Sequence, residues 1–223
     1  MKIKSIYTPS ARQEMLEFIT NKPETTLEVG CREGLFTKSI KAIYNIKDSW
    51  GIEPDSSIKE SAEQNIKNVI IDFFTKDSEL PEKYFDLIIF NDVLEHMYDP
   101  WSALEKAKTL LTENGIIIVS LPNIRHKSVL KELIFNDNFE YKSAGILDAT
   151  HIRFFTKTTM IGMFNEVGLE IIKHKPVILI KKRRWYKKIT QLPRLIFNVL
   201  TLNKFESLQF SQYAFTLQNR NTI

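Results

Sequence analysis

The chain has 223 residues, of which 43% are hydrophobic and 26% are charged, and its net charge is +4. A chain of this length can bury one sizeable core, so we expect one domain with additions. Cys31 is the single cysteine, which excludes a disulfide or a cysteine metal cluster within the chain and indicates a reducing compartment. The sequence shows neither a leader pattern nor an apolar run that could span a bilayer, so we expect a cytoplasmic protein.

Basic residues gather in one late segment of the chain. Ten of the 31 Lys and Arg residues lie between Glu170 and Glu206, where no Asp or Glu occurs. The remaining chain carries 21 basic residues against 27 acidic ones. This asymmetry predicts a basic patch that meets an anionic partner, such as a lipid head group, a phosphorylated substrate or nucleic acid.

Strands and helices are predicted to alternate along the chain. A first helix, at about residues 8–20, is opened by Thr8 and Pro9. Apolar runs separated by stretches with helical spacing then predict five strands, at residues 25–29, 49–53, 68–73, 85–90 and 115–121. This order predicts a parallel sheet with crossover helices. The last two runs are apolar on both faces, which places them at the centre of the sheet.

Later elements follow from capping signals. Asp99 and Pro100 cap and begin a helix, and we expect it to end at Asn114-Gly115. After Pro122 the pattern changes, which predicts a substrate-side insertion at about 123–155. Its parts are a helix at 126–136 and an irregular loop at 137–155, and they are followed by a helix from Thr156 to Gly168.

The stretch LEVGCREG, residues 27–34, joins the first strand to its helix. Ligands of open parallel sheets lie outside the carboxyl ends of the strands, and glycines there let the backbone approach a ligand closely. A dinucleotide fingerprint would require glycine at positions 30, 32 and 35, but the sequence has Gly30, Arg32 and Leu35. This mismatch argues against NAD as the ligand.

Acidic residues follow the next two strands. Glu53 lies where a carboxylate can accept hydrogen bonds from both hydroxyls of a ribose. Asp72 ends the third strand and has Phe73 beside it. A carboxylate and an aromatic ring suit an adenine, because one accepts from its amino group while the other packs on its face. These residues therefore predict a nucleoside ligand.

The stretches LEVGCREG, WGIEPD, VIIDF and FDLIIFNDVLEHMYDPWSALEKAKTLLTENGIIIVSLPN give residues 24–172 a resemblance to a known family. They resemble the class I S-adenosylmethionine-dependent methyltransferases, in the small-molecule branch called type 11, 12 or 23. The resemblance implies a three-layer, Rossmann-like α/β fold with a seven-stranded, mostly parallel sheet and a final antiparallel strand. It makes residues 1–223 a single domain, whose last hairpin comprises residues 168–180 and 207–218.

The resemblance also assigns cofactor residues. The family's first motif ends E/D-x-G-x-G-x-G, so Arg32 stands at its middle glycine. Glu53 is implied at the ribose, Asp72 and Phe73 at the adenine, and Asn91 near the methionine part of S-adenosylmethionine. The full predicted set is Glu28, Gly30, Cys31, Gly34, Glu53, Asp72, Phe73 and Asn91.

Histidines are the candidates for catalysis. If the acceptor is a hydroxyl, a general base is useful, and His96 lies just past the fourth strand. His151 and Arg153 are two residues apart, so in an extended loop they face the same way and suit an anionic or polyhydroxylated acceptor. The alternative is structural: His96 holds its loop, Arg153 pairs with an acid and His151 fills a hydrogen-bonding position.

A metal site is a further alternative. Asp92, Glu95, His96 and His151 are oxygen and nitrogen ligands of the kinds that divalent cations take. We expect S-adenosylmethionine as the cofactor and no metal, and we retain this cluster as a hypothesis that activity after exhaustive chelation would test.

The basic segment, at about residues 181–205, combines cations with aromatic and aliphatic residues. Its composition is typical of a helix on an anionic membrane surface, so residues 181–204 are predicted to contact the inner face of the membrane. A lid over the substrate or a contact within a homo-oligomer are the alternatives. Nucleic acid is not expected, since no recognition motif accompanies the patch.

The acceptor is predicted at the level of its class. Methyltransferases with the HIRFFT loop and a basic-apolar insertion resemble enzymes of cell-surface glycan synthesis. We therefore expect O-methylation of a small or glycan-like acceptor, free or lipid-linked, with S-adenosylhomocysteine as product. The alternatives are a quinone or lipid precursor as acceptor, and a non-catalytic binding module, which Arg32 in the glycine motif suggests.

Overall fold

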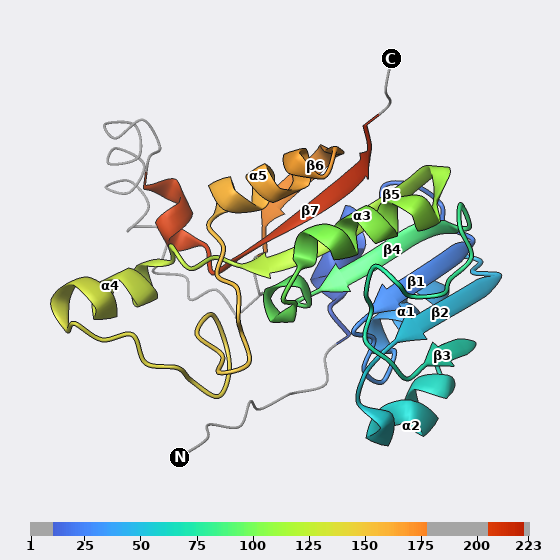
Figure 1. Ribbon diagram of the computed structural model, residues 1–223, viewed down its shortest axis with the longest axis horizontal. Helices are drawn as coiled ribbons and strands as arrows, with labels where there is room; N and C mark the ends of the chain where they lie inside the picture. Colours follow the sequence, from blue (N-terminus) through green and yellow to red (C-terminus); the bar gives the residue numbers. More distant parts are fainter. Residues whose placement is uncertain (1–10, 178–204, 221–223) are drawn as a thin grey trace, which may run out of the picture.

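The computed structural model describes residues 11–177 and 205–220, which form a seven-stranded sheet flanked by helices (Figure 1). The strand order is β3-β2-β1-β4-β5-β7-β6. Strands β1 to β5 are parallel to their neighbours in that group, whereas β7 is antiparallel to both β5 and β6. The predicted α/β fold, with its mostly parallel sheet and final antiparallel strand, is confirmed.

The strands agree closely with the apolar runs of the sequence. Their bounds are β1 Thr25–Val29, β2 Asp48–Ile52, β3 Asn68–Ile70, β4 Phe85–Asn91, β5 Leu111–Pro122, β6 Leu169–Pro176 and β7 Gln212–Asn219. The third strand is shorter than predicted because its pairing with β2 ends at Ile70, and the Asp72 carboxylate beyond it accepts a hydrogen bond from the Phe73 amide. Strand β4 occupies the middle of the sheet, as its apolar pattern predicts.

Helices cover both faces of the sheet. Their bounds are η1 Gln13–Phe18, α1 Leu35–Lys41, η2 Ser56–Ile58, α2 Lys59–Glu63, η3 Leu94–His96, α3 Pro100–Leu110, α4 Lys127–Phe135, α5 Lys157–Glu166 and η5 Glu206–Gln209. The described part of the first predicted helix is the short 3-10 helix η1, and Thr8 and Pro9 lie outside the described residues. The predicted crossover helix between β3 and β4 was wrong, because residues 71–84 form neither helix nor strand.

The end of α3 also differs from the prediction. The helix ends at Leu110, and β5 begins at Leu111, which pairs with Phe85 of β4. Gly115 therefore lies within the strand instead of capping the helix. A Cβ atom there would lie 2.8 Å from the Phe85 carbonyl oxygen, so glycine is needed for close passage of the chain beside β4.

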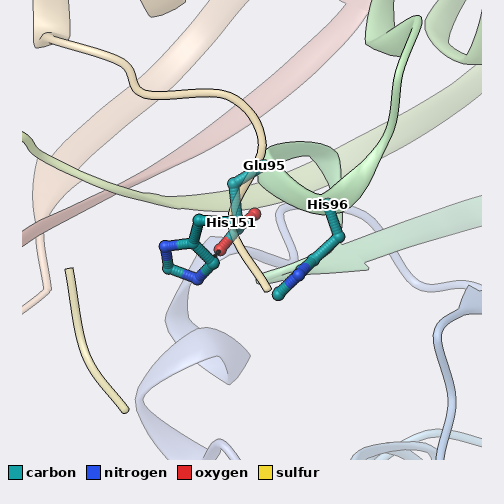
Figure 2. Close-up of side chains that lie close together, drawn as sticks. All are labelled: Glu95, His96 and His151. Atoms are coloured by element: carbon teal, nitrogen blue, oxygen red, sulfur yellow. Dashed lines mark ion pairs between the residues drawn. The ribbon is translucent and has the colours of Figure 1, made fainter. Parts of the chain in front are cut away.

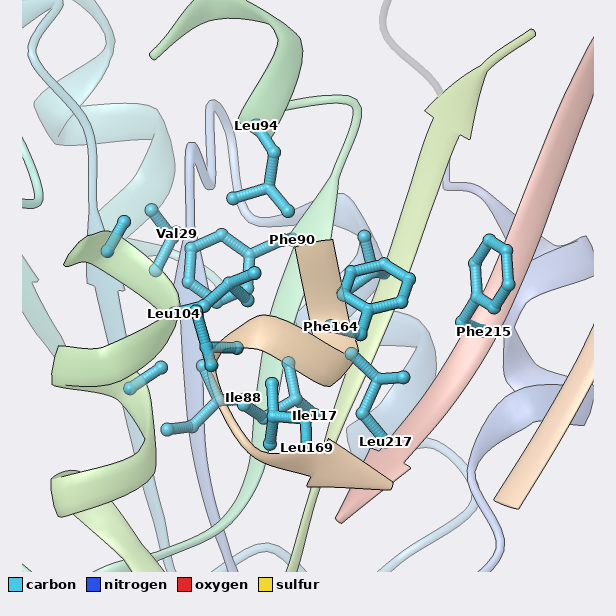
Figure 3. Packing of buried hydrophobic residues seen from close by; sticks show 14 of the residues in the cluster. Val29, Ile88, Phe90, Leu94, Leu104, Ile117, Phe164, Leu169, Phe215 and Leu217 are labelled. Carbon is cyan, nitrogen blue, oxygen red and sulfur yellow. The ribbon is translucent and has the colours of Figure 1, made fainter. Parts of the chain in front are cut away.

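Alternate residues of β4 fill two separate cores. On one face Ile88 and Phe90 pack with Leu104 of α3 and Phe164 of α5 (Figure 3). On the other face Leu87 and Ile89 pack with residues of η1 and α1, namely Met15, Phe18, Phe36 and Ile40. Full burial stabilises each such side chain by about 1.5–3 kcal/mol. The two cores hold β4 and its neighbours in register.

The insertion between β5 and α5 begins with α4, which extends away from the sheet (Figure 1). The chain then returns through the loop 137–155, where the Ile152 and Arg153 amides each donate to the Glu95 carbonyl oxygen at 3.0 Å. These two bonds place His151 beside η3. The insertion therefore joins the carboxyl end of β4 to a distant segment of the chain.

Among the described residues, no helix is long and apolar enough to cross a bilayer. Residues 181–204 lie outside the described residues, so their predicted contact with a membrane stays a prediction.

The start of α5 gives a direct test of local stability. Thr156 accepts a hydrogen bond from the Thr159 amide, and the Thr159 hydroxyl accepts one from the Thr156 amide, which forms a capping box. We predict that Thr156→Ala lowers the free energy of unfolding by about 1 kcal/mol, measured by chemical denaturation. Thr158→Ala, an exposed position on the same helix, is the control. An equal loss in both variants would contradict the role of the cap.

Candidate functional site

Three neighbouring strands end at the same edge of the sheet. Val29 of β1 pairs with Ile52 of β2 and with Phe90 of β4. Gly30 and Glu53, which follow β1 and β2, and Asn91, the last residue of β4, therefore emerge side by side.

A left-handed turn connects β1 to α1. Gly30, Arg32 and Gly34 have φ angles of 66°, 47° and 68°. A Cβ atom on Gly30 would lie 2.7 Å from Val93, and one on Gly34 would lie 2.8 Å from Ile66, so both positions require glycine. Arg32 adopts the left-handed conformation in which glycine is common. Its departure from the glycine motif therefore leaves the turn intact.

Glu53 is fixed by backbone hydrogen bonds and is 4% exposed. Its Oε2 atom accepts from the Arg32 amide at 3.1 Å, and its Oε1 atom accepts from the Asp55 amide at 3.2 Å. The Arg32 guanidinium lies 3.4 Å from the Asp55 carboxylate and 3.9 Å from that of Glu53. A carboxylate has about four lone-pair sites, so Glu53 can still accept two further hydrogen bonds. Its geometry suits the two hydroxyls of a ribose.

Glu28 and Cys31 are buried beneath this turn. The Glu28 carboxylate accepts from the Thr37 hydroxyl at 2.6 Å and from the Thr37 amide at 3.2 Å, which holds the first turn of α1. Burial raises the pKa of Glu28 to about 7. Burial, together with the charges of Glu28 and Glu53, raises the pKa of the Cys31 thiol. Both residues line the cavity described below, whereas Gly34 lies behind it as the N-cap of α1.

The predicted adenine residues follow β3. Asp72 and Phe73 both line the cavity, and the Phe73 side chain is 69% exposed. The next residue, Phe74, is buried and packs edge-on against Phe90 at a ring distance of 5.7 Å. Phe74 thus anchors the segment to the core and leaves the Phe73 ring available to a ligand.

Asn91 carries an unsatisfied amide. Its side-chain nitrogen and oxygen are both buried, and neither has a hydrogen-bond partner among the described residues. A buried amide without partners is costly, so a polar ligand is expected to complete it. Asn91 lines the cavity beside the turn. Together with Glu53, it fits the polar groups at the two ends of S-adenosylmethionine.

Glu95, His96 and His151 meet at the same cavity (Figure 2). The imidazole rings of His96 and His151 lie 4.8 Å apart and nearly perpendicular. The His151 Nε2 atom lies 3.9 Å from a Glu95 carboxylate oxygen. Burial and the charge of Asp92 raise the pKa of Glu95, while burial lowers the pKa of His151, so their neutral forms are favoured.

Two residues of the predicted sets point elsewhere. Asp92 accepts hydrogen bonds from Arg12, Ser120 and Gln212, so it is engaged outside the histidine group. The Arg153 guanidinium donates to the Tyr98 carbonyl oxygen and lies 5.8 Å from the centre of the Trp101 ring. Arg153 is not part of the cavity wall formed by the described residues, and its contact with an acceptor stays a prediction.

Arg12 lines the cavity and was not predicted from the sequence. Its guanidinium is partly buried and contacts Glu14, Asp92, Ser120 and Gln212, so it joins the segment before η1 to the ends of β4 and β5 and the start of β7. A lone arginine in a polar segment carries no sequence signal for such a role, because its partners lie as far as 200 residues away.

The residues of this edge enclose a cavity of about 1500 Å³. Single-ligand pockets are usually roughly 300–1,000 Å³, so the cavity has room for a nucleoside cofactor and an acceptor together. The turn, Glu53 and Asn91 line this cavity, and so does the Glu95, His96 and His151 group.

The fold is of the Rossmann-like class, and the residues at this edge of the sheet suit a nucleoside. The family described as "Methyltransferase domain" matches residues 7–174, which is more than half of the chain. The chain therefore belongs to this methyltransferase family.

Individual relatives are more distant. The ubiquinone biosynthesis O-methyltransferase of Glaesserella parasuis is 27% identical over 116 residues, which are 48% of this chain and 49% of that protein. An uncharacterised protein of Methanocaldococcus jannaschii is 31% identical over 149 residues, which are 66% of this chain and 65% of that protein. The matched regions thus span about half to two thirds of the length of these relatives.

Solved structures share the fold. A methyltransferase of Thermotoga maritima has a TM-score of 0.62 at 15% identity, covering 95% of this chain and 90% of that one. A methyltransferase of Archaeoglobus fulgidus has a TM-score of 0.58 at 18% identity, with coverage of 87% and 85%.

The buried Glu28 predicts a pH dependence of stability. Its pKa is about 7 in the folded protein against 4.5 in the unfolded chain, so the folded state holds the proton more tightly. The stabilisation of the folded state by this proton is fully present below pH 4.5 and is lost as the pH rises to about 7. In this window the wild type should lose on the order of 3 kcal/mol more unfolding free energy than Glu28→Gln, which retains an acceptor for Thr37. Chemical denaturation at several pH values measures this difference. Parallel pH curves for the two proteins would contradict it.

Proposed function

We propose that this methyltransferase acts on a hydroxyl oxygen of a small acceptor. The observation that carries the proposal is the grouping of Glu95, His96 and His151 in the cavity that also contains Asn91 and Glu53. Imidazole and carboxylate groups are suited to orienting a hydroxyl and taking up its proton. Oxygen is also the acceptor atom in the names of the ubiquinone biosynthesis O-methyltransferases among the relatives.

The chemistry needs placement more than covalent participation by the protein. Bound S-adenosylmethionine would supply a methyl group on a cationic sulfur, and S-adenosylhomocysteine would be the leaving group, with the electron pair of the broken C–S bond on sulfur. An acceptor oxygen lone pair forms the new O–C bond, and the hydroxyl proton passes to His96 or His151. Holding the two reactants at attack distance provides most of the acceleration. We assign that holding to Glu53 and Asn91 on the cofactor side.

Two acceptor classes follow from different observations. The sequence favours a glycan-like acceptor, free or lipid-linked, and the named relatives favour a hydroxylated quinone precursor. The non-catalytic alternative was suggested by Arg32, whose φ angle of 47° is compatible with the turn, and it stays an alternative. Contact of residues 181–204 with a membrane, and a homo-oligomer, stay predictions.

The acceptor proposal is tested with methyl-labelled S-adenosylmethionine and two panels, one of lipid-linked sugars and one of prenylated phenols. We expect label to enter one panel, with the methyl group on oxygen when the product is mapped by mass spectrometry and NMR. A product methylated at nitrogen or carbon would contradict the proposal.

The histidine group predicts a division between binding and turnover. His96→Ala and His151→Ala should each lower kcat by about 10²–10⁴-fold, while the Kd for S-adenosylhomocysteine stays unchanged. His174→Ala is the matched control, because His174 is exposed on β6 and is not part of the cavity wall. Steady-state kinetics and calorimetry measure the two effects. Full turnover in the double variant would show that the group has no part in the reaction.

A further inference from the structure

A second pocket, of about 430 Å³, lies at the same edge of the sheet and shares no lining residue with the main cavity. Four segments form its wall: Arg125 after β5, residues 156–158 at the start of α5, Glu206 and Ser207 of η5, and Tyr213 of β7. Figure 1 shows η5 and the starts of α5 and β7 close to the end of β5. The volume lies within the range of roughly 300–1,000 Å³ that is usual for ligand pockets.

A buried asparagine holds the walls of this pocket together. The Asn123 side chain is fully buried, and it donates to the carbonyl oxygens of Ser207 and Phe210 at 2.8 Å each. The amide of the next residue, Ile124, donates to the Phe155 carbonyl oxygen at 2.9 Å. Both η5 and the segment before α5 are thereby fixed against the end of β5. The pocket is therefore formed by contacts within the chain, before any ligand binds.

Tyr213 contributes a buried hydroxyl to the pocket. The residue is 3% exposed, and its hydroxyl has no hydrogen-bond partner among the described residues. Burial raises the pKa of Tyr213, the charge of Glu206 adds to this effect and that of Arg125 opposes it, so the hydroxyl lies near both charged side chains. Buried tyrosine hydroxyls usually have a hydrogen-bond partner. This donor is therefore left for a ligand in the pocket.

Two cations face the same space. Arg125 Nη1 donates to the Ser207 hydroxyl at 2.6 Å, which orients the guanidinium and leaves its other N–H groups available. Lys157 Nζ lies 5.6 Å from the centre of the Tyr213 ring. Among the described residues, no ion pair joins either cation to Glu206, the acid in the pocket wall. Two cations against one carboxylate leave the pocket with a net positive charge.

The start of α5 adds backbone donors to these side chains. The Thr156 hydroxyl accepts from the Thr159 amide, so the amides of Lys157 and Thr158 have no partner within the helix. The amino-terminal end of a helix also favours a negative charge. The amides thus support the site that Arg125, Lys157 and the Tyr213 hydroxyl define.

We propose that this second pocket binds the phosphoryl group of a phosphate ester. Its donors come from four segments, and the tetrahedral oxygens of a phosphate accept from several directions, whereas the two oxygens of a carboxylate lie in one plane. Arginine also binds phosphate oxygens through paired hydrogen bonds. The ester belongs either to a soluble compound or to a lipid head group, and the chemistry at the pocket is the same for both. The site is separate from the main cavity and does not rest on the proposed function.

The test is titration of the full chain with inorganic phosphate and with glycerol 3-phosphate, followed by phosphorus NMR, which should show one saturable site. Arg125→Ala and Lys157→Ala should each weaken binding by about 10-fold or more, because each removes charge-assisted hydrogen bonds, and Tyr213→Phe should weaken it by about 2–10-fold. Glu206→Gln should tighten binding, because it removes a repelling charge. Lys131→Ala, which removes an exposed lysine of α4 outside the pocket, is the matched control and should bind as the wild type does.

Vesicles distinguish the two sources of the ester. Sedimentation with phosphatidylcholine vesicles that contain phosphatidic acid is compared for the wild type, Lys157→Ala and Lys131→Ala. Binding that Lys157→Ala weakens more than Lys131→Ala does would assign a lipid head group to the pocket. Equal vesicle binding by the three proteins, together with saturable binding of glycerol 3-phosphate, would assign a soluble ester.

Absence of saturable binding to all three probes, or equal binding by the wild type and the Arg125, Lys157 and Tyr213 variants, would overturn the proposal. Tyr213→Phe keeps the test valid if Arg125→Ala fails to fold, because it removes only a hydroxyl without a partner among the described residues. Calorimetry with S-adenosylhomocysteine should give the wild-type Kd for every variant, since none of the changed residues lines the main cavity. A cofactor Kd that weakens along with phosphate binding would show a general loss of structure and would also overturn the assignment.

Discussion

The left-handed turn between β1 and α1 is the constraint on which the rest of the site depends. Three of its five residues, Gly30, Arg32 and Gly34, have positive φ angles, and the Arg32 amide is thereby directed at the Glu53 carboxylate. The pairing of Val29 with Ile52 and Phe90 places the neighbouring strand ends at the same level. Displacement of the turn would therefore disturb the Glu53 carboxylate and the approach to Asn91 together.

The two parts of the cavity are supported in different ways. Packed strands position Glu53 and Asn91, and the two cores on either side of β4 stabilise those strands. The Glu95, His96 and His151 group depends on η3 and the loop 137–155, which are joined by two amides that donate to the Glu95 carbonyl oxygen. Each such bond stabilises by only about 0.5–1.5 kcal/mol. Loops on a rigid sheet are where binding functions vary most easily, so we expect the part of the cavity lined by the loop 137–155 to vary more than the strand ends.

Sequence patterns were most informative where local chemistry determines the structure. Apolar runs located β1, β2, β4 and β5 because buried parallel strands are apolar on both faces, and Thr156 located α5 because capping is local. Other features depend on distant partners. The early end of α3 follows from the pairing of Leu111 with Phe85, and Arg12 acquires its role only through Asp92 and Gln212. Spacing in the sequence does not reveal such contacts, and it could not distinguish Asp92, which pairs with Arg12, from Glu95, which faces the histidines.

The central claim is that Glu53 and Asn91 hold the nucleoside cofactor of this methyltransferase. Calorimetric titration with S-adenosylhomocysteine tests it most directly, using the wild type, Glu53→Gln, Asn91→Ala and the exposed control Glu60→Gln. We predict one site per chain and a Kd raised by about 10–100-fold in each of the two site variants, because each loses hydrogen bonds worth about 1.5–3 kcal/mol. The control should bind as the wild type does. Equal affinity in all four proteins, or no binding by the wild type, would contradict this account of the site.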